Sequence, residues 1–173
     1  MKKQMIISIS IILGLILLDQ VSKLMILNHY GGRDILEVCH DTATYCATPA
    51  IKIIPGLISF TFNFNEGGAW GLLFGQMMIF YVITLGSFVL FYFLLKDINL
   101  QTKKLYTYGV LLMIAGAIGN FIDRLFHQRV TDFIRFDFID FPIFNIADIC
   151  LVVGVTMFAI DILLEDVLKW KKQ

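Results

Sequence analysis

Residues 146–164 read IADICLVVGVTMFAIDILL, and this apolar run follows directly on Phe-Pro-Ile-Phe-Asn at positions 141–145. A helix rises about 1.5 Å per residue, so a run of this length crosses the roughly 30 Å hydrocarbon core of a bilayer. Three other apolar runs are also long enough, at about residues 5–27, 72–95 and 105–122. The sequence therefore predicts four transmembrane helices.

The composition is that of an integral membrane protein. Hydrophobic residues make up 58% of the chain, charged residues make up 16%, and the mean hydropathy is +0.78. Soluble domains are nearer about 45–50% apolar and about 25% charged. We expect one integral membrane domain over residues 1–173, present as a monomer. The formal net charge is zero and no basic stripe is present, so no nucleic-acid partner is expected.

The first apolar run follows Lys2 and Lys3, as the core of a secretory signal peptide also would. No small-x-small cleavage site comes after it, and apolar residues resume beyond Lys23. We therefore interpret residues 5–27 as an uncleaved first helix.

Lysines gather at both ends of the chain and between the second and third runs. They stand at positions 2, 3, 96, 103, 104, 169, 171 and 172. With four spans, all of these positions lie on one side of the membrane, which the positive-inside rule assigns to the cytoplasm. Both termini are then cytoplasmic, and the connections at about 28–71 and 123–145 face outward.

The first outward connection carries a strand pattern. Residues 59–65, Ser-Phe-Thr-Phe-Asn-Phe-Asn, alternate polar and aromatic side chains, which is typical of a half-exposed strand. Residues 51–54 can pair with it across Pro-Gly at 55–56. The predicted fold is thus mainly α, with a small extracytoplasmic β-sheet within residues 28–71. Cys39 and Cys46 fall in this region, either as a disulfide or as two free thiols.

Two aspartates stand in apolar surroundings in or next to the second outward connection. Asp132 lies within Val-Thr-Asp-Phe-Ile at 130–134, and Asp148 follows Asn145 by three residues. A buried carboxylate is costly, so we expect both to have a use. Asn145 is a good helix N-cap, and Asp148 three positions later also fits a purely structural capping role. If the carboxyls meet, they share a proton, with Asp148 ionised and Asp132 protonated, and such a pair supports amide hydrolysis.

Other polar groups interrupt the predicted helices. Asn120, Asp123 and Arg124 share one face of the third helix, either at a site or as an ion pair at the helix end. Asp19 and Lys23 are spaced i,i+4 on the first helix. They form either a local pair with Lys23 extended to the headgroups or a brace for the site.

Competing chemistries have weaker support. The three histidines are not spaced as zinc ligands, and no serine has an evident His and acid partner set. Asp137 and Asp140 are candidates to join Asp132 in a metal site, but are more typical of solvated loop charges. An ion-coupled transporter and a purely structural membrane protein are the competing functional classes. A transporter's acids would face a cavity at the membrane midplane.

Five runs together make the chain resemble signal peptidase II, the lipoprotein signal peptidase of bacteria. They are Asp19-Gln-Val-Ser-Lys23, Asn65-Glu-Gly-Gly-Ala-Trp-Gly71, Gly116-Ala-Ile-Gly-Asn-Phe-Ile-Asp-Arg124, Val130-Thr-Asp-Phe133 and Phe144-Asn-Ile-Ala-Asp148. They occur in the family's order relative to the four spans, and together they extend over nearly the whole chain.

The resemblance implies an inner-membrane aspartyl endopeptidase with an extracytoplasmic β-cradle. Such an enzyme cuts the signal peptide from prolipoproteins just before a diacylglyceryl-modified cysteine, with membrane lipid as its other partner and with no metal or organic cofactor. It implies that Asp132 and Asp148 are the catalytic pair. The residues it places around the site are Asn65, Gly67, Asn120, Asp123, Arg124 and Asn145, with Asp19 and Lys23 in a less direct role.

Overall fold

The computed structural model describes residues 2–31, 50–66, 68 and 75–170. Its long helices are α1 (Lys2–His29), α3 (Met77–Leu94), α4 (Lys104–His127) and α5 (Ile146–Trp170), with a 3-10 turn (Leu95–Asp97) after α3. Each of the four is long and apolar enough to cross a membrane. The predicted mainly helical fold, with four helices able to span a bilayer, is confirmed.

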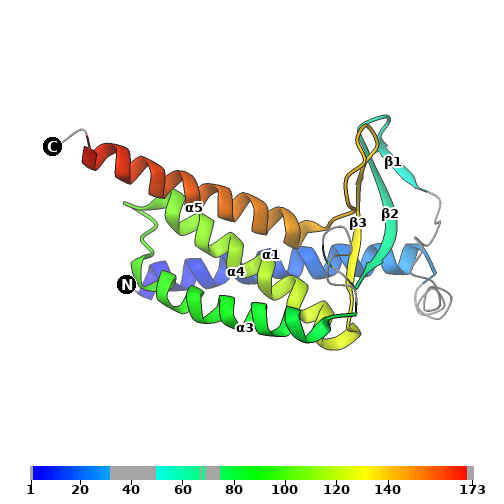
Figure 1. Cartoon of the computed structure of the whole chain (residues 1–173), viewed down its shortest axis with the longest axis horizontal. Helices are drawn as coiled ribbons and strands as arrows, with labels where there is room; N and C mark the ends of the chain where they lie inside the picture. Colours follow the sequence, from blue (N-terminus) through cyan, green and yellow to red (C-terminus); the bar gives the residue numbers. More distant parts are fainter. Residues whose placement is uncertain (1, 32–49, 67, 69–74, 171–173) are drawn as a thin grey trace.

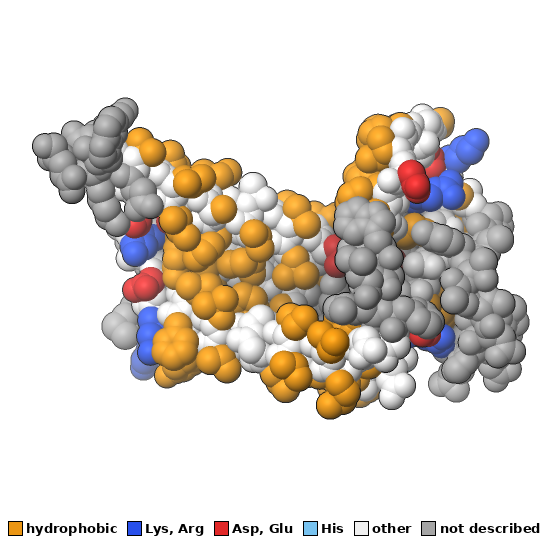
Figure 2. Space-filling model, viewed as in Figure 1, with side chains coloured by type: hydrophobic (Ala, Val, Ile, Leu, Met, Phe, Trp, Pro, Cys, Tyr) orange, Lys and Arg blue, Asp and Glu red, His pale blue; other side chains and the backbone are white. Residues whose placement is uncertain are grey.

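Helix α4 is the central helix. Of its most apolar stretch, 61% is buried inside the protein, against 11% for α1, 6% for α3 and 17% for α5. The apolar side chains of the outer helices are therefore exposed. Figure 2 shows hydrophobic side chains over the helical body, between charged groups at its two ends. In a bilayer this exposed belt contacts lipid.

Glycines let α4 and α5 approach each other closely. A Cβ at Gly109 would lie 2.9 Å from the carbonyl oxygen of Gly154, and one at Gly116 would overlap the carbonyl oxygen of Ala147. Because lipid offers no hydrophobic force between helices, such close backbone contact is a main source of helix association in membranes.

Three antiparallel strands form the sheet, in the order β1 (Ile51–Ile54), β2 (Ile58–Asn65) and β3 (Val130–Phe136). The predicted hairpin between β1 and β2 is confirmed. The prediction that confined the sheet to residues 28–71 is wrong, because β3 comes from the connection between α4 and α5. Its β-branched and aromatic residues favour a strand, and pairing with β3 satisfies the outer edge of β2.

The sheet stands across one end of the helices, and both chain termini lie at the opposite end (Figure 1). β2 was predicted to be a half-exposed strand with its phenylalanines on one face, and this aromatic face is buried at its centre. Phe62 is 1% exposed and forms a cluster with Ile26 of α1 and Phe133 of β3. This cluster fixes β3, and therefore Asp132, against the end of α1.

Helix boundaries also differ from the prediction. α3 begins at Met77 instead of near residue 72, because Gly75 has a left-handed φ of 75° that no helix continues through. α4 runs past the predicted end at residue 122 to His127, because the polar side chain of Asp123 is buried against a partner inside the protein, Lys23. α1 and α5 extend beyond their predicted ends as well. Cys39 and Cys46 lie outside the described residues.

Replacing Gly116 tests the close packing of α4 and α5. Gly116→Ala should lower the free energy of unfolding by about 1–3 kcal/mol, since the new methyl group crowds Ala147 and Leu151. Gly86→Ala on α3 is the matched control, because a Cβ there meets nothing within 4 Å. Thermal unfolding in detergent compares the two variants, and equal midpoints would contradict the packing.

Candidate active site

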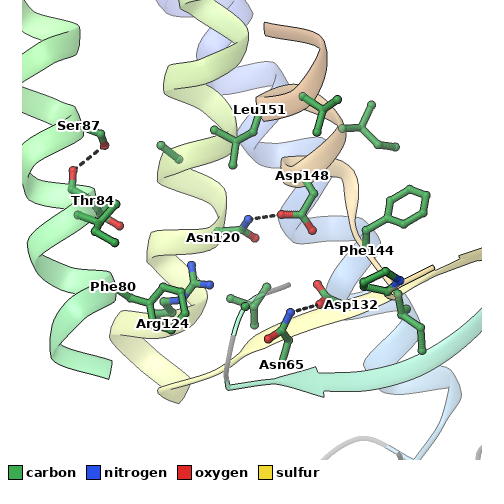
Figure 3. Close-up of a pocket in the computed structure, with 18 of the residues that line it drawn as sticks. Asn65, Phe80, Thr84, Ser87, Asn120, Arg124, Asp132, Phe144, Asp148 and Leu151 are labelled. Atoms are coloured by element: carbon green, nitrogen blue, oxygen red, sulfur yellow. Dashed lines mark hydrogen bonds between the residues drawn. The ribbon is translucent and has the colours of Figure 1, made fainter. Parts of the chain in front are cut away.

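A cavity of about 660 Å³ lies where α3, α4, α5 and β3 converge. Most of its lining is apolar. Its charged and amide side chains are Asn65, Asn120, Arg124, Asp132 and Asp148. Figure 3 shows the carboxyl groups of Asp132, from β3, and Asp148, from the start of α5, facing the same space.

Helix α5 begins with a reciprocal cap. The Asp148 N–H donates to Asn145 Oδ1 at 2.9 Å, and the Asn145 N–H donates to Asp148 Oδ2 at 3.1 Å. This is a capping box, and the predicted N-cap is confirmed. The cap occupies one oxygen of Asp148, while Oδ1 accepts a hydrogen bond from Asn120 Nδ2 at 2.7 Å. Capping alone therefore does not account for Asp148.

Asp132 is 1% exposed and lies beside the end of β2. Its Oδ2 accepts from Asn65 Nδ2 at 2.8 Å, and its Oδ1 accepts from Asn145 Nδ2 at 2.7 Å. Burial and the nearby Asp148 raise the pKa of Asp132 well above its usual range, although these amide donors lower it. Both donors are residues that the family resemblance places around the site. Burial still dominates, so Asp132 keeps its proton to a higher pH than a solvated carboxyl does.

The Asn145 side chain joins the two aspartates. Its oxygen accepts from the backbone of Asp148, and its nitrogen donates to Asp132 and, at 3.1 Å, to Asn120 Oδ1. Asn120 in turn donates to Asp148. Asn65, Asn120 and Asn145 thus join the two carboxyls in one hydrogen-bonded group.

A buried ion cluster lies behind this group. Lys23 Nζ is 2.8 Å from Asp19 Oδ2 and 3.1 Å from Asp123 Oδ2, and its side chain is 5% exposed. The interpretation of Lys23 as extended to the headgroups is therefore wrong, because α4 supplies a second carboxylate inside the protein. The interpretation of Asp123 and Arg124 as an ion pair at the helix end is also wrong, because Asp123 pairs instead with Lys23 of α1.

The two carboxylates of this cluster also hold the elements that carry the aspartates. The Ala147 N–H donates to Asp19 Oδ1 at 2.9 Å, which ties α5 to α1. Gly119 leaves room for this contact, since a Cβ there would lie 2.7 Å from Asp19 Oδ2. The Thr131 N–H donates to Asp123 Oδ2 at 3.0 Å, which ties β3 to α4.

Arg124 lies apart from the ion cluster. Its guanidinium group stacks on the ring of Phe80, 4.2 Å from the centroid, and lines the cavity. The stacking partner on α3 was not predicted, because nothing in the sequence relates the two helices at this level. Gly67, the remaining predicted site residue, lies outside the described residues.

Sequence reasoning missed Gln20. Its Nε2 donates to Asp19 Oδ2 at 3.1 Å, to the Gly119 carbonyl at 3.1 Å and to Asp123 Oδ1 at 3.0 Å. A second polar residue beside Asp19 in an apolar helix was the available signal.

The acidic residues after β3 are occupied elsewhere or exposed. Asp137 accepts from Ser59 Oγ at 2.7 Å and pairs with Arg135 at 3.0 Å, and these contacts lower its pKa. Asp140 is exposed. Within the described part of the chain, no three His, Cys, Asp or Glu side chains come together as a metal site.

Comparison with known proteins gives a consistent set of matches. The family model for signal peptidase (SPase) II matches residues 11–164. A lipoprotein signal peptidase of Staphylococcus epidermidis is 39% identical over 180 residues, covering 100% of this chain and 99% of that protein. One from Lactiplantibacillus plantarum is 39% identical over 156 residues, covering 90% of this chain and 93% of that protein.

A solved structure described as a bacterial membrane enzyme has the same fold. It superimposes with a TM-score of 0.72 at 35% sequence identity, over 92% of this chain and 88% of the other. The helices and sheet described above are therefore arranged as in a known membrane enzyme.

Substitutions of Asn145 separate its two contacts. Asn145→Ser keeps an oxygen that caps α5 but removes the donor to Asp132, whereas Asn145→Ala removes both. We expect both variants to have a lower free energy of unfolding, and the alanine variant to lose about 1 kcal/mol more than the serine variant. Chemical denaturation in detergent measures the difference. Equal losses would show that the cap contributes nothing.

Proposed function

The chain belongs to the signal peptidase II family, and on this premise we propose that Asp132 and Asp148 are its catalytic pair. The protein is a bacterial membrane protease that removes signal peptides from prolipoproteins. One observation carries the assignment of the pair: two carboxyl groups, from β3 and from the start of α5, face one apolar cavity and are joined through Asn145.

In the proposed mechanism, the pair holds one proton and activates a water molecule. The Asp148 carboxylate takes a proton from the water, whose oxygen attacks the scissile carbonyl carbon. Asp132 donates its proton to the carbonyl oxygen, giving a tetrahedral diol. The diol then collapses: Asp148 gives its proton to the amide nitrogen, the C–N bond breaks and the amine leaves, while Asp132 takes the proton of one hydroxyl, so that the pair returns to its starting state. The raised pKa of Asp132 supports its role as the acid, because it holds its proton to a higher pH than an ordinary carboxyl does.

The cavity also supports a lipid-modified substrate. Its lining is mainly apolar and continues along α3 and α5 away from the aspartates, through residues such as Ile83, Phe91 and Val152. Apolar walls of this kind bind acyl chains or an apolar peptide segment by removing their surface from water. We infer that the scissile bond lies just before a diacylglyceryl-modified cysteine, which enters from the bilayer, and that the enzyme works as a monomer.

We further infer that both termini are cytoplasmic and that the site faces outward. The described lysines at positions 2, 3, 96, 103 and 104 belong to the start of α1, the turn after α3 and the start of α4, and these helix ends lie opposite the sheet (Figure 1). A cysteine at position 3, introduced in a variant whose own three cysteines are replaced, tests this orientation. If it reacts with a membrane-impermeant maleimide added outside intact cells, the orientation is wrong.

Substitution of each aspartate tests the catalytic pair. Asp132→Asn and Asp148→Asn should each reduce cleavage of a diacylated prolipoprotein at least about a thousandfold, since each removes one partner of the proton exchange. Asp161→Asn is the matched control, an aspartate on α5 that does not line the cavity. Substantial turnover by either of the first two variants, once shown to be inserted and folded, would refute the pair.

The pH dependence of kcat should be bell-shaped. Activity falls at low pH when both carboxyls are protonated, and at high pH when both are ionised. Because burial raises the pKa of Asp132, the alkaline limb lies well above the range of an ordinary carboxyl. Asn65 lowers that pKa, so Asn65→Ala should move the alkaline limb to higher pH and leave the acid limb in place. A shift to lower pH would contradict this assignment of the acid.

A further inference from the structure

The buried ammonium group of Lys23 makes three polar contacts, and one of them leads towards the catalytic pair. Two contacts are the ion pairs with Asp19 and Asp123, and the third is a hydrogen bond to Asn120 Oδ1 at 3.2 Å. An ammonium group has three donors, so all three are used. Lys23 does not line the cavity and is separated from it by Asn120.

The contacts of Asn120 allow one orientation of its amide. Lys23 Nζ and Asn145 Nδ2 both donate to Oδ1, so this atom has to be the oxygen. The nitrogen is then turned to Asp148, to which it donates at 2.7 Å. In the reversed orientation, an NH₂ group would face the ammonium group and the Asn145 amide, and the oxygen would face a carboxylate.

We propose that Lys23 is a positioning residue, which keeps Asp148 as the ionised member of the catalytic pair by holding the Asn120 amide with its nitrogen towards Asp148. The inference rests on the proposed function, in which Asp148 is the base. A carboxylate that accepts an oriented amide donor keeps its charge more readily, and a donor chain that starts from a cation strengthens each bond in it.

Lys23 acts on Asp148 mainly by fixing the orientation of the Asn120 amide, and less through the net charge of the ion cluster. The charged groups around Asp148 are Asp19 and Lys23 from α1, Asp123 and Arg124 from α4, and Asp132 from β3, while α3 has none. Within the ion cluster the carboxylate of Asp19 opposes the field that the Lys23 ammonium group exerts on Asp148. What the cluster offers Asp148 is the fixed orientation of Asn120.

The pH profile of Lys23→Met tests this role. Loss of the donor frees the Asn120 amide to turn, so Asp148 takes up its proton at a higher pH. The acid limb of kcat should move up by roughly one pH unit, while KM stays unchanged because Lys23 does not line the cavity. A residue that only supports the fold would lower activity equally at every pH. An unshifted profile would overturn the proposal.

A double-mutant cycle with Asn120→Ala tests whether Lys23 acts on Asp148 through the Asn120 amide. If Lys23 acts through Asn120, Lys23→Met should shift the acid limb in the natural background and cause no further shift in the Asn120→Ala background. Equal shifts in both backgrounds would show a direct field effect and overturn the role of the amide.

Lys23→Met leaves two buried carboxylates without their cation, so a charge-balanced variant is needed if it fails to fold. Lys23→Met/Asp123→Asn removes one charge of each sign and should still move the acid limb up. Asp123→Asn alone, which keeps Lys23, should not move it up. A natural profile in the double variant would reject the inference while leaving the catalytic pair intact. Active Asp132→Asn or Asp148→Asn variants would instead reject the proposed pair itself.

Discussion

The start of α5 has to satisfy its backbone N–H groups at a place shielded from water, and the site is built around that requirement. Free amides at a helix terminus are costly in apolar surroundings. Here the Asn145 side chain accepts a hydrogen bond from the backbone N–H of Asp148, and Asp19 of α1 accepts one from the backbone N–H of Ala147. The same side chains then hold Asp148 against Asn120 and Asp132. The polar groups that make a buried helix start possible are therefore also the groups that bring the two carboxyls together.

The position of these groups also bears on the competing functions. The aspartates lie at the sheet end of the helices and not halfway along them (Figures 1 and 3), whereas ion-coupled transport calls for acids at the membrane midplane. A structural role for the polar groups explains Lys23, Asp19 and Asp123, which contact each other. It does not explain Asp132, whose burial raises its pKa beside a cavity.

Local patterns in the sequence were enough for the helices, the β1–β2 hairpin and the cap of α5. Apolar length, alternation along residues 59–65 and the Asn-x-x-Asp spacing each depend on neighbours within a few positions. The third strand and the burial of Lys23 could not be found in this way, because each depends on a partner far along the chain. Asn65 meets Asp132, and Lys23 meets Asp123. For the proposed catalytic pair, the apolar surroundings of two carboxylates indicated paired-carboxylate chemistry if the two met, and the family resemblance implied that they do.

The spacing of Asp19 and Lys23 has a consequence for how the protein enters the membrane. Both residues are synthesised about a hundred positions before Asp123 and even earlier than Ala147, which are their later partners. During that interval α1 has no other helix to neutralise its charges. Asp19 and Lys23 are one helical turn apart, so each is the counter-ion of the other. Their pairing lowers the free-energy cost of placing either charge in lipid. The Asp19–Lys23 ion pair, which supports the site in the folded protein, can thus form within the first helix before the rest of the chain is made.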